Sequence, residues 1–240
     1  MPTSEQKSLN SKNKFFVIFA ILFLTLCLAA VTSGYLLYSS SNKTQIKPSS
    51  SASLSEQLND HGAFIFPRPI TVTDVPFINE EDQTVTKENN LGKWSFIFFG
   101  YTFCPDICPT TLAVMQQMWV NLSSEDQAKT QIVLVSVDIE RDTPEQLKTY
   151  MDYFDPSFTA FTGNASSLRS FTAQLNAVYA KVDRLNEAGE VDPELGYLMD
   201  HSANIAILDP NGNYYGFIKP PFTPKKMLAI VNAIHTAQQP

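Results

Sequence analysis

An uncharged, apolar stretch near the N-terminus divides this 240-residue chain into a candidate membrane segment and a candidate folded domain. The 28 residues between Lys14 and Lys43 contain no charged side chain, and 20 of the 24 residues from Phe15 to Tyr38 are apolar or aromatic. About 20 apolar residues are enough for a helix to cross the hydrocarbon layer. The sequence therefore predicts a transmembrane helix over residues 15–38.

The charges around this stretch predict its orientation. Three lysines lie within residues 1–14, whereas Ser39–Asn42 follow the stretch without charge. Because basic residues mark the cytoplasmic flank of a span, we expect residues 1–14 in the cytoplasm and the rest of the chain outside it. A cleaved signal peptide, with small residues near Ala30–Ser33, is the alternative, although the apolar run continues beyond the length of a signal core.

The segment after the apolar stretch is typical of a linker. Residues 39–57 contain eight serines and few bulky side chains, so we expect a flexible tether. Residues 58–240 then form one folded domain, which carries 22 acidic and 12 basic side chains. This acidic excess argues against nucleic acid, or an anionic membrane surface, as a partner of the folded part.

The folded domain alternates between apolar runs of strand length and helical patterns. The runs at Trp94–Gly100 and Ile132–Asp138 are typical of buried parallel strands. With a hairpin around Asp209–Gly212 and a final helix, this order predicts an α/β, thioredoxin-like fold. The other expected elements are helices over Pro109–Leu122, Asp142–Tyr153 and Ser166–Leu175, a strand over Ala177–Asp183, hairpin strands over Ser202–Leu208 and Tyr214–Ile218, and a helix from Thr223 to about His235.

Two cysteines lie where the first central strand meets the helix that follows it. The segment from Gly100 to Pro109 reads G-Y-T-F-C-P-D-I-C-P and contains Cys104 and Cys108. Parallel-sheet folds hold ligands and redox groups at this edge of the sheet. The N–H groups at the start of a helix favour thiolate over thiol, so we expect a lowered cysteine pKa. A three-residue spacer brings the two sulfurs close enough to form a disulfide or to share an ion.

A histidine occupies the facing position. His201 directly precedes an alternating strand, and in a thioredoxin-like fold this junction faces the cysteine turn. A lone histidine is more often structural, but two thiolates and one imidazole form a ligand set that suits copper. Thiolates favour Cu(I), and imidazole also accepts Cu(II). A structural zinc ion takes four protein ligands, and the sequence offers no fourth ligand near this set.

The remaining histidines and the nearby sulfur-containing residues fit ordinary packing. His61 lies early in the domain and His235 in the last helix, so we expect surface or packing roles for both. Met115 and Met118 have helical spacing and are expected in the core. Cys27 lies within the apolar stretch, and we expect it to be an apolar residue of the span.

The motifs taken together resemble those of the Sco (SenC) family of membrane-anchored copper proteins. The likeness covers most of residues 70–235. One position departs from the family's V-S-x-D-P-E-R-D-T stretch, because Ile139 stands where the family usually has proline. The matching segments are F-F-G-Y-T at Phe98–Thr102, C-P-D-I-C-P at Cys104–Pro109, V-S-V-D-I-E-R-D-T-P at Val135–Pro144, D-H-S at Asp200–Ser202 and L-D-P-N-G at Leu208–Gly212.

The resemblance implies a thioredoxin fold that binds one copper ion through two cysteines and a histidine. Carried over by position, Cys104, Cys108 and His201 are the expected ligands. Asp138, at the end of the second strand, is either an acidic group behind those ligands or a cap of the strand end. Members of the family serve assembly of the binuclear copper site in subunit 2 of cytochrome c oxidase, by delivering copper or by keeping that subunit's cysteines reduced.

The leading hypothesis is a copper chaperone anchored to a bacterial inner membrane by one helix, with its folded domain in the periplasm. Its partners are then cytochrome c oxidase subunit 2 and an upstream copper donor. The alternative is an enzyme, a thiol–disulfide reductase, in which Cys104 and Cys108 form the redox pair and His201 only shifts their pKa. Copper binding that depends on His201 separates the two hypotheses.

Overall fold

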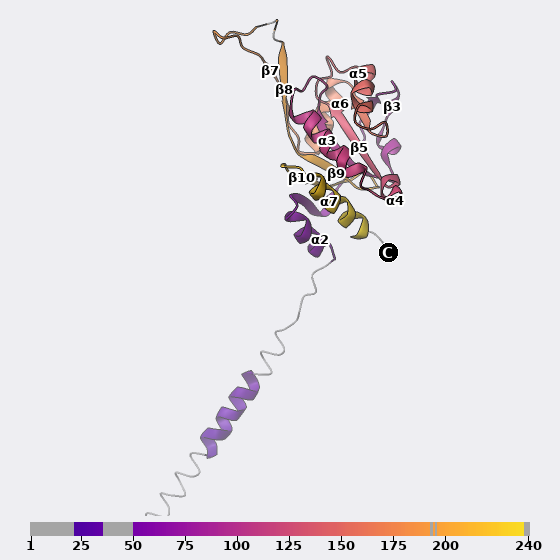
Figure 1. The fold of residues 1–240 in the computed structure, drawn as a ribbon. Coiled ribbons are helices and arrows are strands. Elements are labelled where there is room, and N and C mark those ends of the chain that lie inside the picture. Colours follow the sequence, from indigo (N-terminus) through magenta and orange to yellow (C-terminus); the bar gives the residue numbers. More distant parts are fainter. Residues whose placement is uncertain (1–21, 36–49, 193, 195, 238–240) are drawn as a thin grey trace, which may run out of the picture. The chain divides into compact units, whose positions relative to one another are not determined.

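The computed structural model of the protein describes residues 22–35, 50–192, 194 and 196–237 (Figure 1). The chain forms two compact units, Met1–Lys47 and Pro48–Pro240. In the first unit, residues 22–35 are helical. No helix in the described part of the chain is both long and apolar enough for a membrane crossing. The span expected over residues 15–38 extends beyond the described residues at both ends, so it stays a prediction.

The second unit is built on an eight-stranded mixed sheet with the order β1-β10-β9-β4-β5-β6-β2-β3. At its centre, β4 (Trp94–Gly100) runs parallel to β5 (Thr130–Ser136), which runs parallel to β6 (Thr159–Thr162). This arrangement confirms the predicted α/β, thioredoxin-like core. The remaining strands of the sheet are β9 (Ile205–Leu208) and β10 (Tyr214–Ile218) beside β4, with β1 (Ala63–Ile70) at one edge and β2 (Phe77–Asn79) and β3 (Thr84–Val85) at the other.

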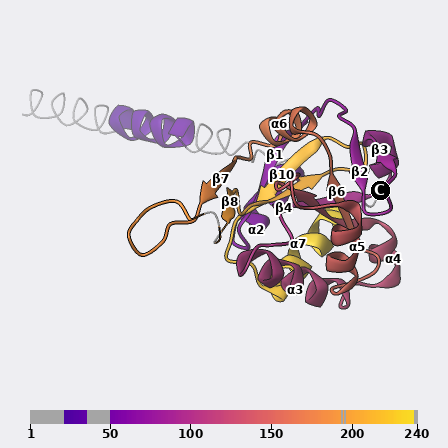
Figure 2. The same ribbon diagram turned by 90° about the horizontal axis from the view of Figure 1, so that it is seen from above.

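Helices cover both faces of this sheet. Figure 2 shows α3 (Ile107–Trp119), α5 (Pro144–Asp152) and α7 (Pro224–Ala237) on one face and α6 (Ala165–Gln174) on the other. The connections β4–α3–β5 and β5–α5–β6 join neighbouring parallel strands, and right-handed crossovers place both of their helices on the same face. The short helices α4 (Ser124–Ala128) and η1 (Lys87–Asn90) lie in connections.

The central strands agree with the prediction from the apolar runs. All seven residues of β4 are buried, as a strand covered on both faces requires. The second strand, β5, begins and ends two residues before the expected limits of Ile132 and Asp138. Its end is set locally, because the hydroxyl of Ser136 accepts a hydrogen bond from the backbone N–H of Asp138 at 3.0 Å and turns the chain.

Helix α5 begins at a proline that has a capping residue in front of it. Thr143 is the cap, and its hydroxyl accepts a hydrogen bond from the N–H of Gln146 at 3.3 Å. Pro144 then occupies the first helical position, where its missing N–H costs nothing. Asp142 precedes the cap and accepts 2.6 Å hydrogen bonds from the hydroxyls of Thr102 and Ser136. These two bonds tie the end of β5 to the segment after β4.

The last part of the linker expected over residues 39–57 is a helix of the folded domain. Helix α2 spans Ser50–Asn59, and its Leu54 and Leu58 are buried against β1 and α7. Two leucines four residues apart lie on one face of a helix, so this short segment gains enough apolar contact to join the domain. The serine content concealed that pattern. Residues 36–49, and residues 1–14 of the expected cytoplasmic segment, lie outside the described part.

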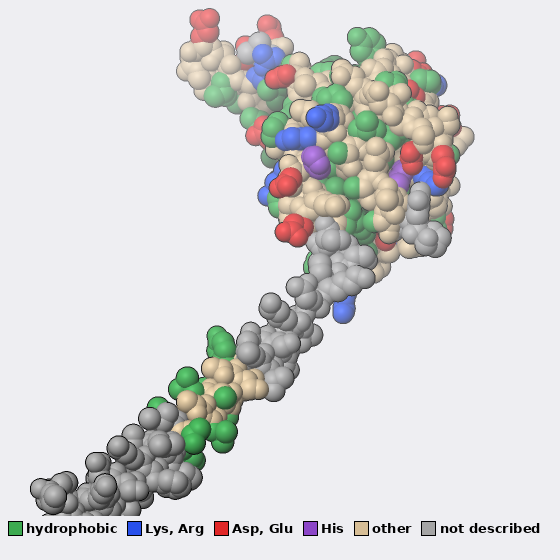
Figure 3. Space-filling model, turned by 60° about the horizontal axis from the view of Figure 1, so that its bottom comes forward, with side chains coloured by type: hydrophobic (Ala, Val, Ile, Leu, Met, Phe, Trp, Pro, Cys, Tyr) green, Lys and Arg blue, Asp and Glu red, His purple; other side chains and the backbone are tan. Residues whose placement is uncertain are grey.

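The segment that carries His201 forms a separate two-stranded ribbon. In this ribbon β7 (Tyr179–Asp183) pairs antiparallel with β8 (Tyr197–His201), and neither strand joins the main sheet. His201 therefore ends a strand of its own instead of directly preceding β9, which starts at Ile205. The ribbon projects from the domain (Figure 1), and exposed carboxylates gather on the projecting part (Figure 3), among them Asp183, Glu187, Glu190 and Glu194.

Candidate metal centre

The cysteine turn connects the end of β4 to the start of α3. Cys104 lies in the turn and is 8% exposed, whereas Cys108 lies in the first turn of α3 and is fully buried. Both are free thiols. Helix α3 begins at Ile107, two residues before the expected start, so Pro109 lies within its first turn. This start brings the N–H of Cys108 to 3.4 Å from Sγ of Cys104.

The turn requires a glycine at the end of β4. A Cβ atom on Gly100 would lie 3.0 Å from Sγ of Cys108 and 2.9 Å from Cδ1 of Leu134. Both distances are well below ordinary van der Waals contact, so a side chain here would push the sulfur out of place. The absence of a side chain at position 100 is therefore what allows Cys108 to pack against the strand.

His201 reaches the cysteines from the end of β8. Its Nε2 lies 3.6 Å from Sγ of Cys108. Its Nδ1 lies 3.1 Å from the carbonyl oxygen of Ser202. A carbonyl oxygen only accepts hydrogen bonds, so Nδ1 carries a proton and donates it to Ser202, which turns Nε2 toward the sulfurs. The rings of Phe98 and Tyr101 meet the imidazole edge-on and hold its plane.

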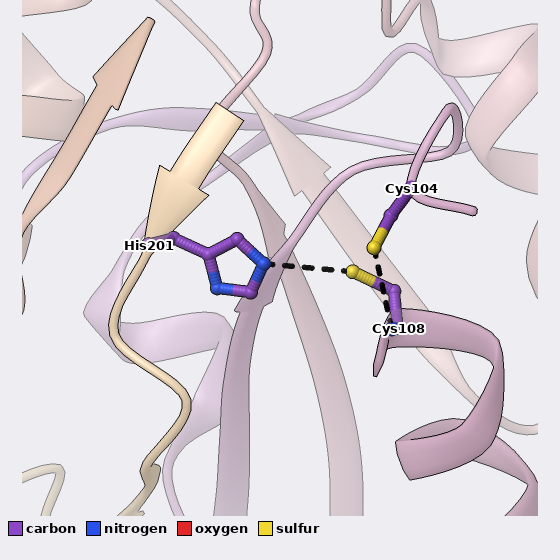
Figure 4. Close-up of side chains that lie close together, drawn as sticks. All are labelled: Cys104, Cys108 and His201. Carbon is purple, nitrogen blue, oxygen red and sulfur yellow. Dashed lines mark hydrogen bonds between the residues drawn. The ribbon is translucent and has the colours of Figure 1, made fainter. Parts of the chain in front are cut away.

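The three predicted ligands come together. One ligand atom from each of Cys104, Cys108 and His201 lies within 4.8 Å of the others, and the residues between 22 and 237 that the structure describes contain no second group of this kind. Figure 4 shows the three side chains pointing toward one another from the turn, the helix start and the strand end. This geometry suits a small ion that binds sulfur and nitrogen.

The two thiols titrate as a pair. The pKa of Cys104 is lowered to about 4, mainly because Cys108 donates a hydrogen bond to its thiolate. Burial opposes this shift, but hydrogen bonds from His201 and from the N–H groups of Asp106 and Cys108 stabilise the thiolate further. The same hydrogen bond and deep burial raise the pKa of Cys108. At neutral pH the pair therefore holds one proton, with the thiolate on Cys104 and the thiol on Cys108.

An open pocket of about 240 Å³ leads to this cluster from the solvent. Its walls come from the cysteine turn and from the end of β8, where Leu198, Met199 and Asp200 precede the histidine. Ile107 lines this pocket with an exposed apolar side chain, and Phe103, which precedes Cys104 in the turn, is exposed as well. Cys104 and His201 line the pocket, so a small ion or a side chain of another protein can reach these two ligands from the solvent, whereas Cys108 lies deeper.

Asp138 lies behind the cluster and contacts none of the three predicted ligands by a hydrogen bond. Its buried carboxylate accepts a hydrogen bond from the hydroxyl of Tyr197 at 2.8 Å and forms an ion pair with Nε of Arg141 at 2.5 Å. Tyr197 begins the strand that ends at His201, so Asp138 is connected to the histidine through β8. Its role as an acidic group behind the ligands stays a prediction.

Sequence reasoning missed Arg141 and Tyr197 as residues of this region. The guanidinium of Arg141 lies over the ring of Tyr197 and also faces Phe103 and Tyr101. These rings come from the cysteine turn and from β8, which are distant in sequence. Arg141 lies within the family-like segment Val135–Pro144, but that motif alone does not predict stacking on rings from distant segments.

The residues set aside from the site lie where packing was predicted. Met115 and Met118 are fully buried on α3. His235 is buried in α7 and bonds to the hydroxyl of Thr130 at 3.2 Å and to the carboxylate of Asp126 at 2.7 Å. His61 is half-buried after α2. These placements agree with the surface or packing roles expected for the two histidines and with the core positions expected for the two methionines.

The fold and the cluster define a thioredoxin-like domain with two cysteines and one histidine at the end of its central strands. Residues 68–236 match the SCO1/SenC family. The chain belongs to this family. The expected likeness is thereby confirmed over most of the folded domain.

Relatives and solved structures agree with this assignment. The SCO2-like protein RT0576 of Rickettsia typhi is 32% identical over 198 residues, which cover 82% of this chain and 88% of that protein. The structure of Bradyrhizobium japonicum ScoI with copper bound is 28% identical, has a TM-score of 0.58, and covers 68% of this chain and 98% of that one. The crystal structure of yeast Sco1 with copper bound is 26% identical and has a TM-score of 0.61. The match covers 72% of this chain and 92% of the yeast chain.

Proposed function

We propose that this protein is a copper-binding metallochaperone that serves assembly of the binuclear copper site of cytochrome c oxidase subunit 2. The observation that carries the proposal is the convergence of Cys104, Cys108 and His201 within 4.8 Å at the mouth of an open pocket. The copper-bound Sco structures of Bradyrhizobium japonicum and yeast support copper as the ion, since they share the family and the fold of this chain.

The donor set fits copper in both common oxidation states. Two thiolates suit Cu(I), and an imidazole nitrogen adds a ligand that Cu(II) accepts. Cys104 is already a thiolate at neutral pH, and its pKa is lowered to about 4. Cys108 must lose its proton when a metal binds. Copper binding therefore releases protons, and the affinity for copper increases as the pH rises. His201, with Nδ1 on the carbonyl of Ser202, offers Nε2.

Delivery then proceeds by ligand exchange at the mouth of the pocket. Thiolates of the partner enter as Cys104 and Cys108 leave, and the open rim allows both sets to meet at the ion. We further propose that residues 15–38 anchor the chain in a bacterial inner membrane, with the folded domain in the periplasm. Anchoring beside a membrane-bound partner raises the effective concentration of the domain toward about the millimolar range.

The second candidate is a thiol–disulfide reductase, which the low pKa of Cys104 favours. Its thiolate attacks one sulfur of a partner disulfide, forms a mixed disulfide and releases the first partner thiolate. Cys108 then loses its proton and attacks Sγ of Cys104, so a Cys104–Cys108 disulfide forms, the second partner thiolate leaves and two electrons pass to the partner. The deep burial and raised pKa of Cys108 slow this resolving step.

Copper titration of the reduced, purified full chain separates the two candidates. We expect wild type to bind one copper ion per chain, and His201→Ala to bind Cu(II) at least about tenfold more weakly. His61→Ala is the matched control and should bind as wild type does. The proposal is overturned if wild type binds copper only loosely while it reduces a small disulfide at a rate that His201→Ala leaves unchanged. Cys104→Ala removes both activities and does not discriminate.

A further inference from the structure

The side chain of Arg141 joins three segments that surround the cluster. It lies in the loop between β5 and α5, and its Nε forms an ion pair with the buried carboxylate of Asp138 at 2.5 Å. Its Nη1 donates a hydrogen bond to the backbone carbonyl of Tyr197 at 3.3 Å. The loop itself is fixed, because the N–H groups of Arg141 and Asp142 both donate to the carbonyl of Asp138.

The guanidinium of Arg141 also faces aromatic rings from both neighbouring segments. Its Cζ lies 3.7 Å from the ring centroid of Tyr197, 4.7 Å from that of Phe103 and 5.9 Å from that of Tyr101. Cations within about 6 Å of a ring face are attracted by its electrons. Tyr101 and Phe103 belong to the cysteine turn, and Tyr197 begins β8. Arg141 therefore holds the cysteine turn and the histidine strand together.

The ribbon needs such a connection. β7 and β8 pair only with each other among the strands that the structure describes, so no ladder of backbone hydrogen bonds fixes β8 to the main sheet. A second cation also contacts Tyr197, because Nζ of Lys181 lies 3.9 Å from its ring centroid and pairs with Glu140 at 2.8 Å. From Tyr197, β8 runs directly to His201.

We propose that Arg141 is a positioning residue that keeps the imidazole of His201 beside the two sulfurs and thereby selects for Cu(II). This inference rests on the proposed copper-binding function and adds a determinant of oxidation state to it. Two thiolates alone hold Cu(I), whereas Cu(II) gains from the imidazole nitrogen. A ribbon released from Arg141 carries the histidine away from the sulfurs but leaves Cys104 and Cys108 in their turn. Loss of Arg141 therefore weakens Cu(II) binding and spares Cu(I) binding.

The variants are chosen to separate positioning from folding. Arg141→Gln removes the charge and the ion pair with Asp138, while Arg141→Lys keeps the charge but lacks the flat guanidinium that stacks on Tyr197. Tyr197→Phe keeps the ring and loses its hydrogen bond to Asp138. Arg169→Gln is the matched control, because Arg169 is exposed on α6.

Competition titrations with Cu(I) and Cu(II) on the reduced full chain test the inference. We expect Arg141→Gln to weaken Cu(II) binding by about tenfold or more and Cu(I) binding by less than about threefold. Arg141→Lys should lose Cu(II) affinity in the same direction, and Tyr197→Phe should lose less. Arg169→Gln should match wild type. Equal losses for both ions, or no loss in either Arg141 variant, would overturn the inference and leave the proposed function intact.

A measurement without copper keeps the inference independent of the proposed function. In the metal-free wild-type chain, nuclear Overhauser contacts between the ring protons of His201 and Tyr101 are expected, because the ring centroids lie 6.1 Å apart. Arg141→Lys should weaken or lose these contacts, while the contacts within the core remain. Unchanged contacts in this variant overturn the positioning role whatever the copper titrations give. Failure of wild type to bind copper overturns the proposed function instead.

Discussion

Sγ of Cys108 and Nε2 of His201 lie 3.6 Å apart although 93 residues separate them in the sequence. One atom comes from the first turn of a helix that follows a central strand, and the other from the end of a ribbon outside the main sheet. The cluster is therefore a product of tertiary structure. Changes that move either segment should alter the chemistry of the sulfurs without touching them.

Cys104 is expected to react with iodoacetamide at a rate that changes little between pH 6 and pH 8. Its pKa is lowered to about 4, so the reactive thiolate is already fully formed at pH 6. Cys108 stays unmodified in the folded chain, because burial and its hydrogen bond to Cys104 raise its pKa. Mass spectrometry of the alkylated peptides, in a Cys27→Ser background, measures both rates.

The unfolded chain provides the control for this reactivity. In guanidinium chloride both cysteines should alkylate faster as the pH rises, by about tenfold per unit below pH 8. His201→Ala should move the rate profile of Cys104 to higher pH, since the hydrogen bond from His201 helps to lower the pKa. A folded-state rate for Cys104 that rises tenfold per pH unit would contradict the predicted thiolate.

Gly100→Ala should destabilise the domain and disturb the cluster together. The added methyl group would lie 3.0 Å from Sγ of Cys108 and 2.9 Å from Cδ1 of Leu134. Overpacking of this kind costs about 1–3 kcal/mol of the free energy of unfolding. Urea denaturation measures that cost, and copper titration measures the loss of affinity. Gly189→Ala, at an open position on the ribbon with a positive φ, is a control that should affect only the ribbon.

Leu58→Ala should lower the free energy of unfolding of the folded domain by about 2–5 kcal/mol. Leu58 is fully buried on α2, so its truncation leaves a cavity beneath that helix. Gln57→Ala changes an exposed neighbour and should stay within about 0.5 kcal/mol of wild type. If both variants unfold at the same urea concentration as wild type, α2 contributes nothing to the stability of the domain.

Asp126→Asn should reduce stability more at neutral pH than at pH 3. Hydrogen bonds from Ser123 and His235 lower the pKa of Asp126 below its usual value. A carboxyl group with a lowered folded-state pKa stabilises the fold above its unfolded pKa of about 4, and this contribution is lost as the pH falls through the folded-state pKa. Because Asp126 is partly exposed, we expect less than about 1 kcal/mol.

Urea midpoints of wild type and Asp126→Asn at several pH values between 3 and 7 check this dependence. The two midpoints should differ at pH 7 and approach each other as the pH is lowered. Asp60→Asn, at an exposed position after α2, is the matched control and should track wild type throughout. A constant difference between wild type and Asp126→Asn over the whole range would contradict the linkage.

The sequence predicts the elements that local patterns define. The apolar runs predict β4 with the bounds that the structure shows and β5 with bounds that differ by two residues. The turn residues predict the hairpin of β9 and β10. The three members of the cluster were also predictable, because the cysteines lie at a strand–helix junction and His201 at the junction that faces it. These features depend on residues that are close in sequence or on the general plan of the fold.

The features that escaped prediction depend on contacts between distant segments. Helix α2 is short and rich in serine, and only its contacts with β1 and α7 reveal why Leu54 and Leu58 are apolar. Arg141 stacks on Phe103 from the cysteine turn and on Tyr197 from β8. No local sequence pattern connects these segments with the loop that carries Arg141. The strand β8 was not predicted either, because it pairs with β7 in a separate ribbon and not with a strand of the main sheet.

X-ray absorption at the copper edge tests the central claim most directly. The reduced full chain, loaded with one equivalent of copper(II) under conditions that retain this oxidation state, should show two sulfur ligands and one imidazole nitrogen in the wild type. His201→Ala should lose the nitrogen contribution and keep the two sulfurs. A wild-type spectrum without sulfur ligands, or one that His201→Ala leaves unchanged, would contradict a copper site built from Cys104, Cys108 and His201.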